Sequence, residues 1–239
     1  MFQKIIAFAL IPVITMITGG IIAVIKKPGG NLRSLILHFA AGVVFSVVAV
    51  EILPDIIKNH LPVYTIIGFA IGFLAMTGIR HFTVEGETNS SSTKGKIPWG
   101  IITGIGVDII IDGFLLGIAF AAGHTEGVLL AIALSVEFLS LGMATSTSLA
   151  NENISKKRSL ITVIVLAAIF FASAILGAAV LRNASHEVMD TVLSFGLSAL
   201  LFLITEELLK EAHEEKETIW HTSAFFFGFL VFLILGMYV

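Results

Sequence analysis

The sequence contains no cysteine, which excludes disulfide bonds and thiolate metal ligands. Any metal chemistry must therefore use oxygen ligands, imidazole nitrogen or the weak thioether of methionine. The lack of cysteine also removes the usual indication of the redox compartment.

Charged residues are scarce as well. Asp, Glu, Lys and Arg make up 13% of the chain, whereas apolar residues make up 56% and the mean hydropathy is +1.00. This composition is typical of an integral membrane protein. The net charge is −3 and no concentrated basic run is present, so nucleic acid is not expected as a partner. The sequence also lacks a nucleophile–base pair, a phosphate-binding loop and a dinucleotide fingerprint, so we expect no enzyme.

The chain does have long apolar runs. A hydrocarbon core about 30 Å thick requires a helix of about 20 apolar residues. The first run ends in Lys26-Lys27 without a small-residue cleavage site, so we interpret it as a retained span rather than a signal peptide. A polar stretch at about 80–97 predicts a flexible loop between two halves. The sequence thus predicts one all-α transmembrane domain over 1–239, with eight spans at 4–25, 33–57, 62–79, 98–122, 127–150, 157–181, 187–211 and 218–238.

Basic residues alternate strongly between the two sides of this predicted bundle. Lys4, Lys58 and Arg182 lie on one side, and the remaining eleven of the fourteen lie in or beside the loops after spans one, three, five and seven. The positive-inside rule places the basic side in the cytoplasm. We therefore expect a cell-membrane protein with both termini outside the cytoplasm and the 80–97 loop inside.

Two pairs of similar segments predict an inverted internal repeat. Residues 108–113 in the fourth span match residues 137–142 in the fifth at an offset of 29. Residues 51–55 in the second span match residues 207–211 in the seventh at an offset of 156, which also pairs Phe39 with Phe195. Both pairs run in opposite directions through the membrane. They predict a 3+2+3 inverted-repeat arrangement, in which a substrate site lies near the midplane.

Three carboxylates lie near the middle of neighbouring spans. Asp108 and Asp112 are four residues apart and share one face of the fourth span, and Glu137 lies at a comparable depth in the fifth. Each acid at the bilayer centre costs about 2.5 to 3.5 kcal/mol on insertion scales, which favours a shared cation or proton site. A divalent cation would relieve their mutual repulsion, and carboxylate oxygens favour Mn²⁺, Mg²⁺ or Ca²⁺, with Fe²⁺ also compatible. The alternative is buried acids bonded only to Ser, Thr or backbone.

The eight-span plan and these acids resemble the ZIP family of zinc- and iron-regulated divalent metal transporters, over nearly the whole chain. The family motif His-Asn-x-Pro-Glu-Gly maps onto residues 108–113, with Asp108 at the histidine and Asp112 at the glutamate. In the fifth span, Glu137 takes a histidine position. Residues 206–213, Glu-Glu-Leu-Leu-Lys-Glu-Ala-His, are similar to the family's exit motif Glu-Glu-Leu-Leu-Pro-Glu-Ala-His.

The resemblance implies transport of a divalent metal ion, such as Zn²⁺, Mn²⁺ or Fe²⁺, toward the cytoplasm by alternating access, with spans one, four, five and six moving. The metal is then a substrate rather than a resident cofactor. The ligands so implied lie at the midplane and at the cytoplasmic exit, and Glu51 near the outer end of the second span is a candidate for attracting cations at the entrance. The candidate metal residues are Asp108, Asp112, Glu137, Glu207, Glu211, His213 and Glu51.

The sequence departs from the family pattern in ways that affect the site. Ile109 and Phe138 occupy positions of polar second-site ligands, Leu141 occupies that of a liganding glutamate, and Ile111 replaces a helix-kinking proline. We therefore expect one metal site rather than two, with weaker preference for Zn²⁺.

Two other functions remain open at this point. One is a transport-inactive or metal-sensing homologue whose buried acids are structural. The other is a proton-linked carrier of an organic cation, which normally requires an aromatic cage; only Phe114, Phe120 and Phe138 are near. The sequence does not decide the oligomeric state, and a homodimer is compatible with it.

Overall fold

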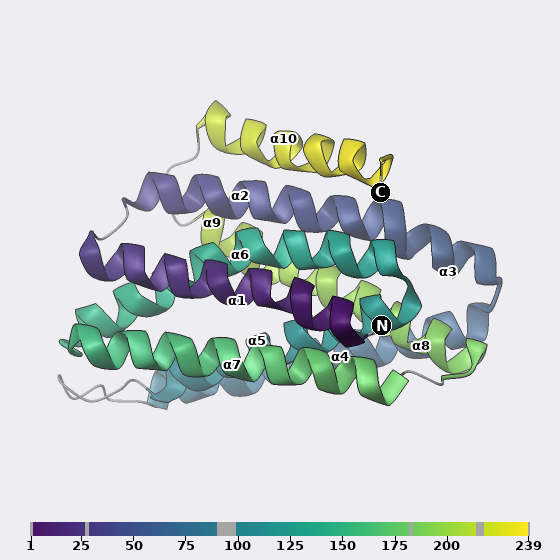
Figure 1. Ribbon diagram of the computed structural model, residues 1–239, viewed down its shortest axis with the longest axis horizontal. Coiled ribbons are helices and arrows are strands. Elements are labelled where there is room, and N and C mark those ends of the chain that lie inside the picture. The colour runs from purple at the N-terminus through teal and green to yellow at the C-terminus, as the bar shows by residue number, and fades with distance from the viewer. Residues whose placement is uncertain (1, 27–28, 90–98, 182–183, 214–217, 239) are drawn as a thin grey trace.

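Figure 1 shows the computed structural model as a bundle of long helices aligned with its longest axis. It describes residues 2–26, 29–89, 99–181, 184–213 and 218–238. These described residues form helices and turns but no strand. Within them, eight helical spans are long and apolar enough to cross a membrane. The predicted all-α membrane fold is therefore confirmed.

Six of these spans are single helices, and the other two each contain a π-helical segment. The single helices are α1 (Phe2–Ile25), α4 (Pro62–Asn89), α5 (Trp99–Ala122), α6 (His124–Asn151), α7 (Lys156–Leu181) and α10 (Ile219–Gly236). The second span consists of α2 (Gly30–Val47), η1 (Val48–Ile52) and α3 (Leu53–Asn59), and the seventh consists of α8 (His186–Phe202), η2 (Leu203–Leu208) and α9 (Leu209–Ala212).

The end of α4 is the main difference from the prediction. We expected the helix to stop at residue 79 and a flexible loop to begin at Arg80, but α4 continues to Asn89. The rest of that predicted loop, 90–98, lies outside the described residues. No proline or glycine pair interrupts 80–89, so the polar residues there extend the helix beyond the apolar segment. Arg80 consequently lies on a helix, half-buried, instead of in a loop.

The helices alternate in direction, so the bundle has two distinct ends. Both chain termini lie at the same end, on the right in Figure 1, and we call it the terminal end. Helices α1, α4, α6 and α8 begin there. The opposite end holds the starts of α2, α5, α7 and α10.

The helices pack in two groups. Helices α1, α5, α6 and α7 make extensive contacts with one another, chiefly α1 with α6 and α5 with α7. Outside this four-helix group, α2 packs against α10 and α4 packs against α8. The grouping separates the two predicted repeat pairs, since the acids of α5 and α6 belong to the first group and the Glu51 and Glu207 segments belong to the second.

Three observations support the inverted repeat at an offset of 156. The π-helical segments η1 and η2 begin at Val48 and Leu203 and end at Ile52 and Leu208, so they occupy corresponding positions. The α4–α8 pair corresponds to the α10–α2 pair. Their close approaches also correspond, because a Cβ on Gly72 would lie 2.7 Å from the Phe195 carbonyl oxygen and one on Gly228 would lie 2.4 Å from that of Phe39.

Candidate cation site

Asp108, Asp112 and Glu137 converge as the sequence predicts. One carboxylate oxygen from each lies within 4.8 Å of the others. Asp108 and Asp112 come from successive turns of α5, and Glu137 comes from the middle of α6, which packs beside it. Asp112 is 1% exposed and Glu137 is 4% exposed, whereas Asp108 is half-buried.

Two oxygens of this cluster have no hydrogen-bond partner within the described part of the chain. Asp112 Oδ2 and Glu137 Oε2 are buried and accept no hydrogen bond from any described residue. Buried polar atoms are nearly always hydrogen-bonded, and a buried carboxylate is stable only when paired or bound to a cation. The alternative in which Ser, Thr or backbone groups satisfy these acids therefore does not account for these two atoms.

Glu207 joins the cluster from the other helix group. Its side chain lines the same cavity as Asp108 and Glu137 and interacts with both of them electrostatically. The resemblance places Glu207 at the exit, but the structure places it beside the midmembrane acids, as a fourth carboxyl group.

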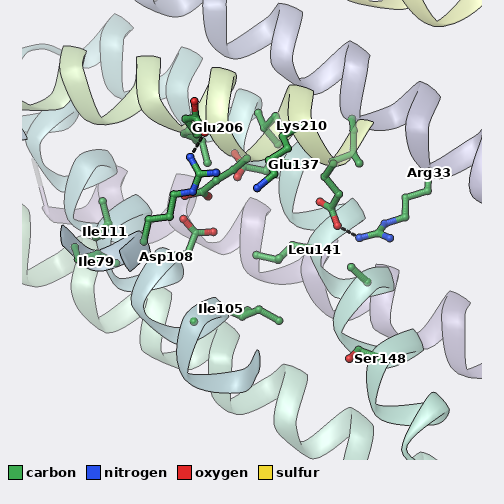
Figure 2. Close-up of a pocket in the computed structure, with 18 of the residues that line it drawn as sticks. Arg33, Ile79, Ile105, Asp108, Ile111, Glu137, Leu141, Ser148, Glu206 and Lys210 are labelled. Atoms are coloured by element: carbon green, nitrogen blue, oxygen red, sulfur yellow. Dashed lines mark hydrogen bonds and ion pairs between the residues drawn. The ribbon is translucent and has the colours of Figure 1, made fainter. Parts of the chain in front are cut away.

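A cavity of about 510 Å³ connects the acids to the opposite end of the bundle. Figure 2 shows the side chains of Asp108, Glu137, Glu206 and Lys210 among those that line this space. Along α6 the lining runs from Glu137 to Asn151, about 21 Å at the usual helical rise. The intervening α6 lining residues are Leu141, Ala144, Thr147 and Ser148.

Basic residues also line this cavity, which sequence reasoning did not anticipate. Arg33 of α2 forms an ion pair with Glu211 of α9, and Arg80 of α4 forms one with Glu206 of η2. Lys210 is a further lining residue. Arg80 is also close enough to interact electrostatically with Glu207. The missed signal is that Arg80 follows the buried Met76 by four residues, about one helical turn, so a continuing α4 places both on the same face.

The remaining predicted residues lie apart from the central acids. Glu211 is held by Arg33 in the cavity wall. His213 is exposed at the opposite end and contacts His38, with ring centroids 5.2 Å apart. Glu51 lies in η1, half-buried, where Glu126 and Asp55 are its acidic neighbours. Glu126, at the start of α6, was not anticipated because the predicted span began after it.

Toward the terminal end the path is closed. The space there is a void of about 10 Å³ between η1 and α8 on one side and α5 and α6 on the other. Apart from Glu126 its lining is apolar or glycine: Ile52, Leu115, Ile118, Ala119, Leu130, Leu193, Gly196 and Leu200. Among the described residues, the acidic cluster is therefore open to a wide cavity toward the opposite end and packed over on the terminal side.

Comparison with protein-family models and with curated proteins finds no match for this chain. The functional argument therefore depends on the architecture and the site. Eight membrane-length helices around a buried acidic cluster, reached by a cavity from one end, fit a membrane transporter.

Proposed function

We propose that this protein transports a divalent metal cation through a carboxylate site formed by Asp108, Asp112 and Glu137. The observation that carries the proposal is the pair of buried, unpartnered oxygens, Asp112 Oδ2 and Glu137 Oε2, in a cluster whose ligand atoms lie within 4.8 Å of one another. A divalent ion offsets the repulsion of several acids in one step. Oxygen ligands alone suit Mn²⁺, Mg²⁺ or Ca²⁺, with Fe²⁺ and Zn²⁺ as further candidates.

The direction of transport is toward the cytoplasm in this proposal. The described basic residues at the opposite end include Lys26, Lys156 and Arg158, whereas Lys4 and Lys58 are those described at the terminal end. The positive-inside rule then makes the open cavity cytoplasmic and both termini extracytoplasmic. The structure would accordingly represent an inward-open state. The grouping of α1 with α5, α6 and α7 supports the resemblance to ZIP transporters, in which the corresponding spans move together.

An organic cation is a weaker candidate substrate. The described cavity lining contains no aromatic residue. Phe138 is fully buried and packs edge-on against Phe170 with ring centroids 4.6 Å apart, so it is not available for a cage.

The proposal is tested by replacing the two buried acids by their amides. Purified Asp112→Asn and Glu137→Gln proteins should lose Mn²⁺ binding and proteoliposome uptake, yet melt at the same or a higher temperature because a buried charge is removed. The exposed Glu187→Gln is the matched control and should behave as the wild type. Wild-type uptake in both buried-acid variants would contradict the site. Metal binding without uptake in the wild type would instead favour the metal-sensing alternative.

A further inference from the structure

The open cavity and the closed void are related by the internal repeat. One wall of the cavity is formed by the second and seventh spans. Its residues Leu37 and Leu208 correspond at the offset of 156 to Leu193 and Ile52, which line the void. On the facing wall the offset is 29. There the cavity residues Ala144, Thr147 and Ser148 correspond to the void residues Leu115, Ile118 and Ala119.

The cavity and the void are therefore formed by corresponding surfaces, which are separated at the cavity and packed together at the void. One measures about 510 Å³ and the other about 10 Å³, although both lie between corresponding faces of the two helix groups. Related segments can adopt related geometries. The closed terminal side therefore shows the geometry of the cavity side when it closes, and the open cavity shows the geometry of the terminal side when it opens.

The same offsets pair the acids. Glu207 corresponds to Glu51 at 156, and Asp108 corresponds to Glu137 at 29. The interaction between Glu207 and Asp108, which line the same cavity, therefore has a counterpart, a contact between Glu51 and Glu137. That contact is not formed here, since Glu51 has Glu126 and Asp55 as its neighbours and Glu137 Oε2 has no partner among the described residues.

We propose that Glu51 and Glu207 are alternating ligands of one cation held by Asp108, Asp112 and Glu137. Glu207 completes the site while the cavity at the opposite end is open, and Glu51 replaces it when the terminal end opens. This inference rests on the proposed function. A second observation, besides the clustering of the acids, points to a ligand: the buried oxygens Asp112 Oδ2 and Glu137 Oε2 have no hydrogen-bond partner among the described residues.

The exchange has a physical advantage. A cation that lost a carboxylate on each half-cycle would be left with uncompensated charge in a low-dielectric site. Because Glu51 of η1 and Glu207 of η2 take turns beside Asp108, Asp112 and Glu137, four carboxyl groups surround the cation in each end state. The π-helical segments fit this role, because π-bulges shift side chains relative to the regular helix and occur often at functional sites.

The chain has no cysteine, so each state can be trapped by introduced pairs. Ile52→Cys with Ala119→Cys joins two walls of the closed void and should cross-link in the present state. The corresponding pair is Leu208→Cys with Ser148→Cys, across the open cavity. It should cross-link only after the terminal end opens. Reductant should reverse the block of uptake in both proteins.

Binding of Mn²⁺ to each trapped form then tests the exchange. With the Ile52–Ala119 cross-link, Glu207→Gln should weaken binding roughly tenfold and Glu51→Gln far less; with the Leu208–Ser148 cross-link the order should reverse. The exposed Glu187→Gln serves as control in both forms. Equal effects of the two variants in both forms would overturn the exchange while leaving the site intact. Failure of either trapped form with unaltered acids to bind Mn²⁺ would instead overturn the proposed function.

Discussion

Asn59 Nδ2, at the end of α3, donates a hydrogen bond of 3.1 Å to Asp190 Oδ1, near the start of α8. Thr65 Oγ1 of α4 donates to the other oxygen of Asp190 at 3.0 Å, and Asp190 is fully buried. At the opposite end, Ser34 Oγ donates to the Ala212 carbonyl oxygen at 2.7 Å. Ser34 and Asp190 are again 156 residues apart. Hydrogen bonds therefore join the second and seventh spans at both ends of the bundle, through the corresponding residues Ser34 and Asp190.

The Asp190 contacts predict a loss of stability when they are removed. Asp190→Ala removes the acceptor of the Asn59 amide and leaves the Thr65 hydroxyl only the Leu61 carbonyl oxygen, so the free energy of unfolding should fall by about 2 kcal/mol. Asp190→Asn keeps one carbonyl oxygen and should cost less. Thermal melting of the detergent-purified proteins measures both. An Asp190→Ala protein that melts with the wild type would show that these hydrogen bonds contribute nothing.

The basic-residue distribution predicts the sidedness of the bundle. Lys156→Cys at the opposite end should resist an impermeant maleimide added outside intact cells and react only after permeabilisation, whereas Lys58→Cys should react at once. Lys58 is suited to this test because its side chain is 75% exposed. The cysteine-free chain provides the unlabelled control. Labelling of Lys156→Cys from outside would overturn the assigned orientation of the bundle in the membrane.

Arg80 predicts an electrostatic effect on cation affinity. It pairs with Glu206, interacts with Glu207 and lines the cavity, so its positive charge opposes a bound cation. Arg80→Gln should therefore tighten Mn²⁺ binding about threefold or more, with a stronger dependence on salt.

The double variant Arg80→Gln with Glu206→Gln is the control for that prediction. It restores the net charge of the cavity and should bring the affinity back toward that of the wild type. Isothermal titration of the three proteins decides the matter. If the double variant binds as tightly as Arg80→Gln, the effect comes from lost packing against Phe202, over whose ring the guanidinium lies at 5.9 Å, rather than from charge.

The all-oxygen ligand set predicts how histidine substitutions change the metal preference of the site. Asp108→His together with Glu137→His adds two imidazoles, which Zn²⁺ exploits more than Mn²⁺. The ratio of Zn²⁺ to Mn²⁺ affinity should rise about tenfold in competition assays at fixed pH. An unchanged ratio would mean that these two positions are not ligands.

Much of the fold could be predicted from the sequence. Span length is fixed by the thickness of the hydrocarbon core, so apolar runs predicted the ends of the helices to within three residues, except at α4. The offsets of 29 and 156 predicted the repeat because both halves keep the same local pattern. The acids at 108, 112 and 137 could be predicted to meet because four residues make about one helical turn and both helices cross the same depth.

Only the tertiary structure decided which charges meet across helices. Nothing in the spacing indicates that Arg33 pairs with Glu211, that Arg80 pairs with Glu206, or that Glu207 rather than Glu51 lies against the central acids. These contacts depend on how the two helix groups are placed against each other. An inverted repeat is compatible with two related placements of its halves. In the placement seen here, Ile52 of η1 and residues of α5 line a void of only about 10 Å³, so the terminal side is the packed one.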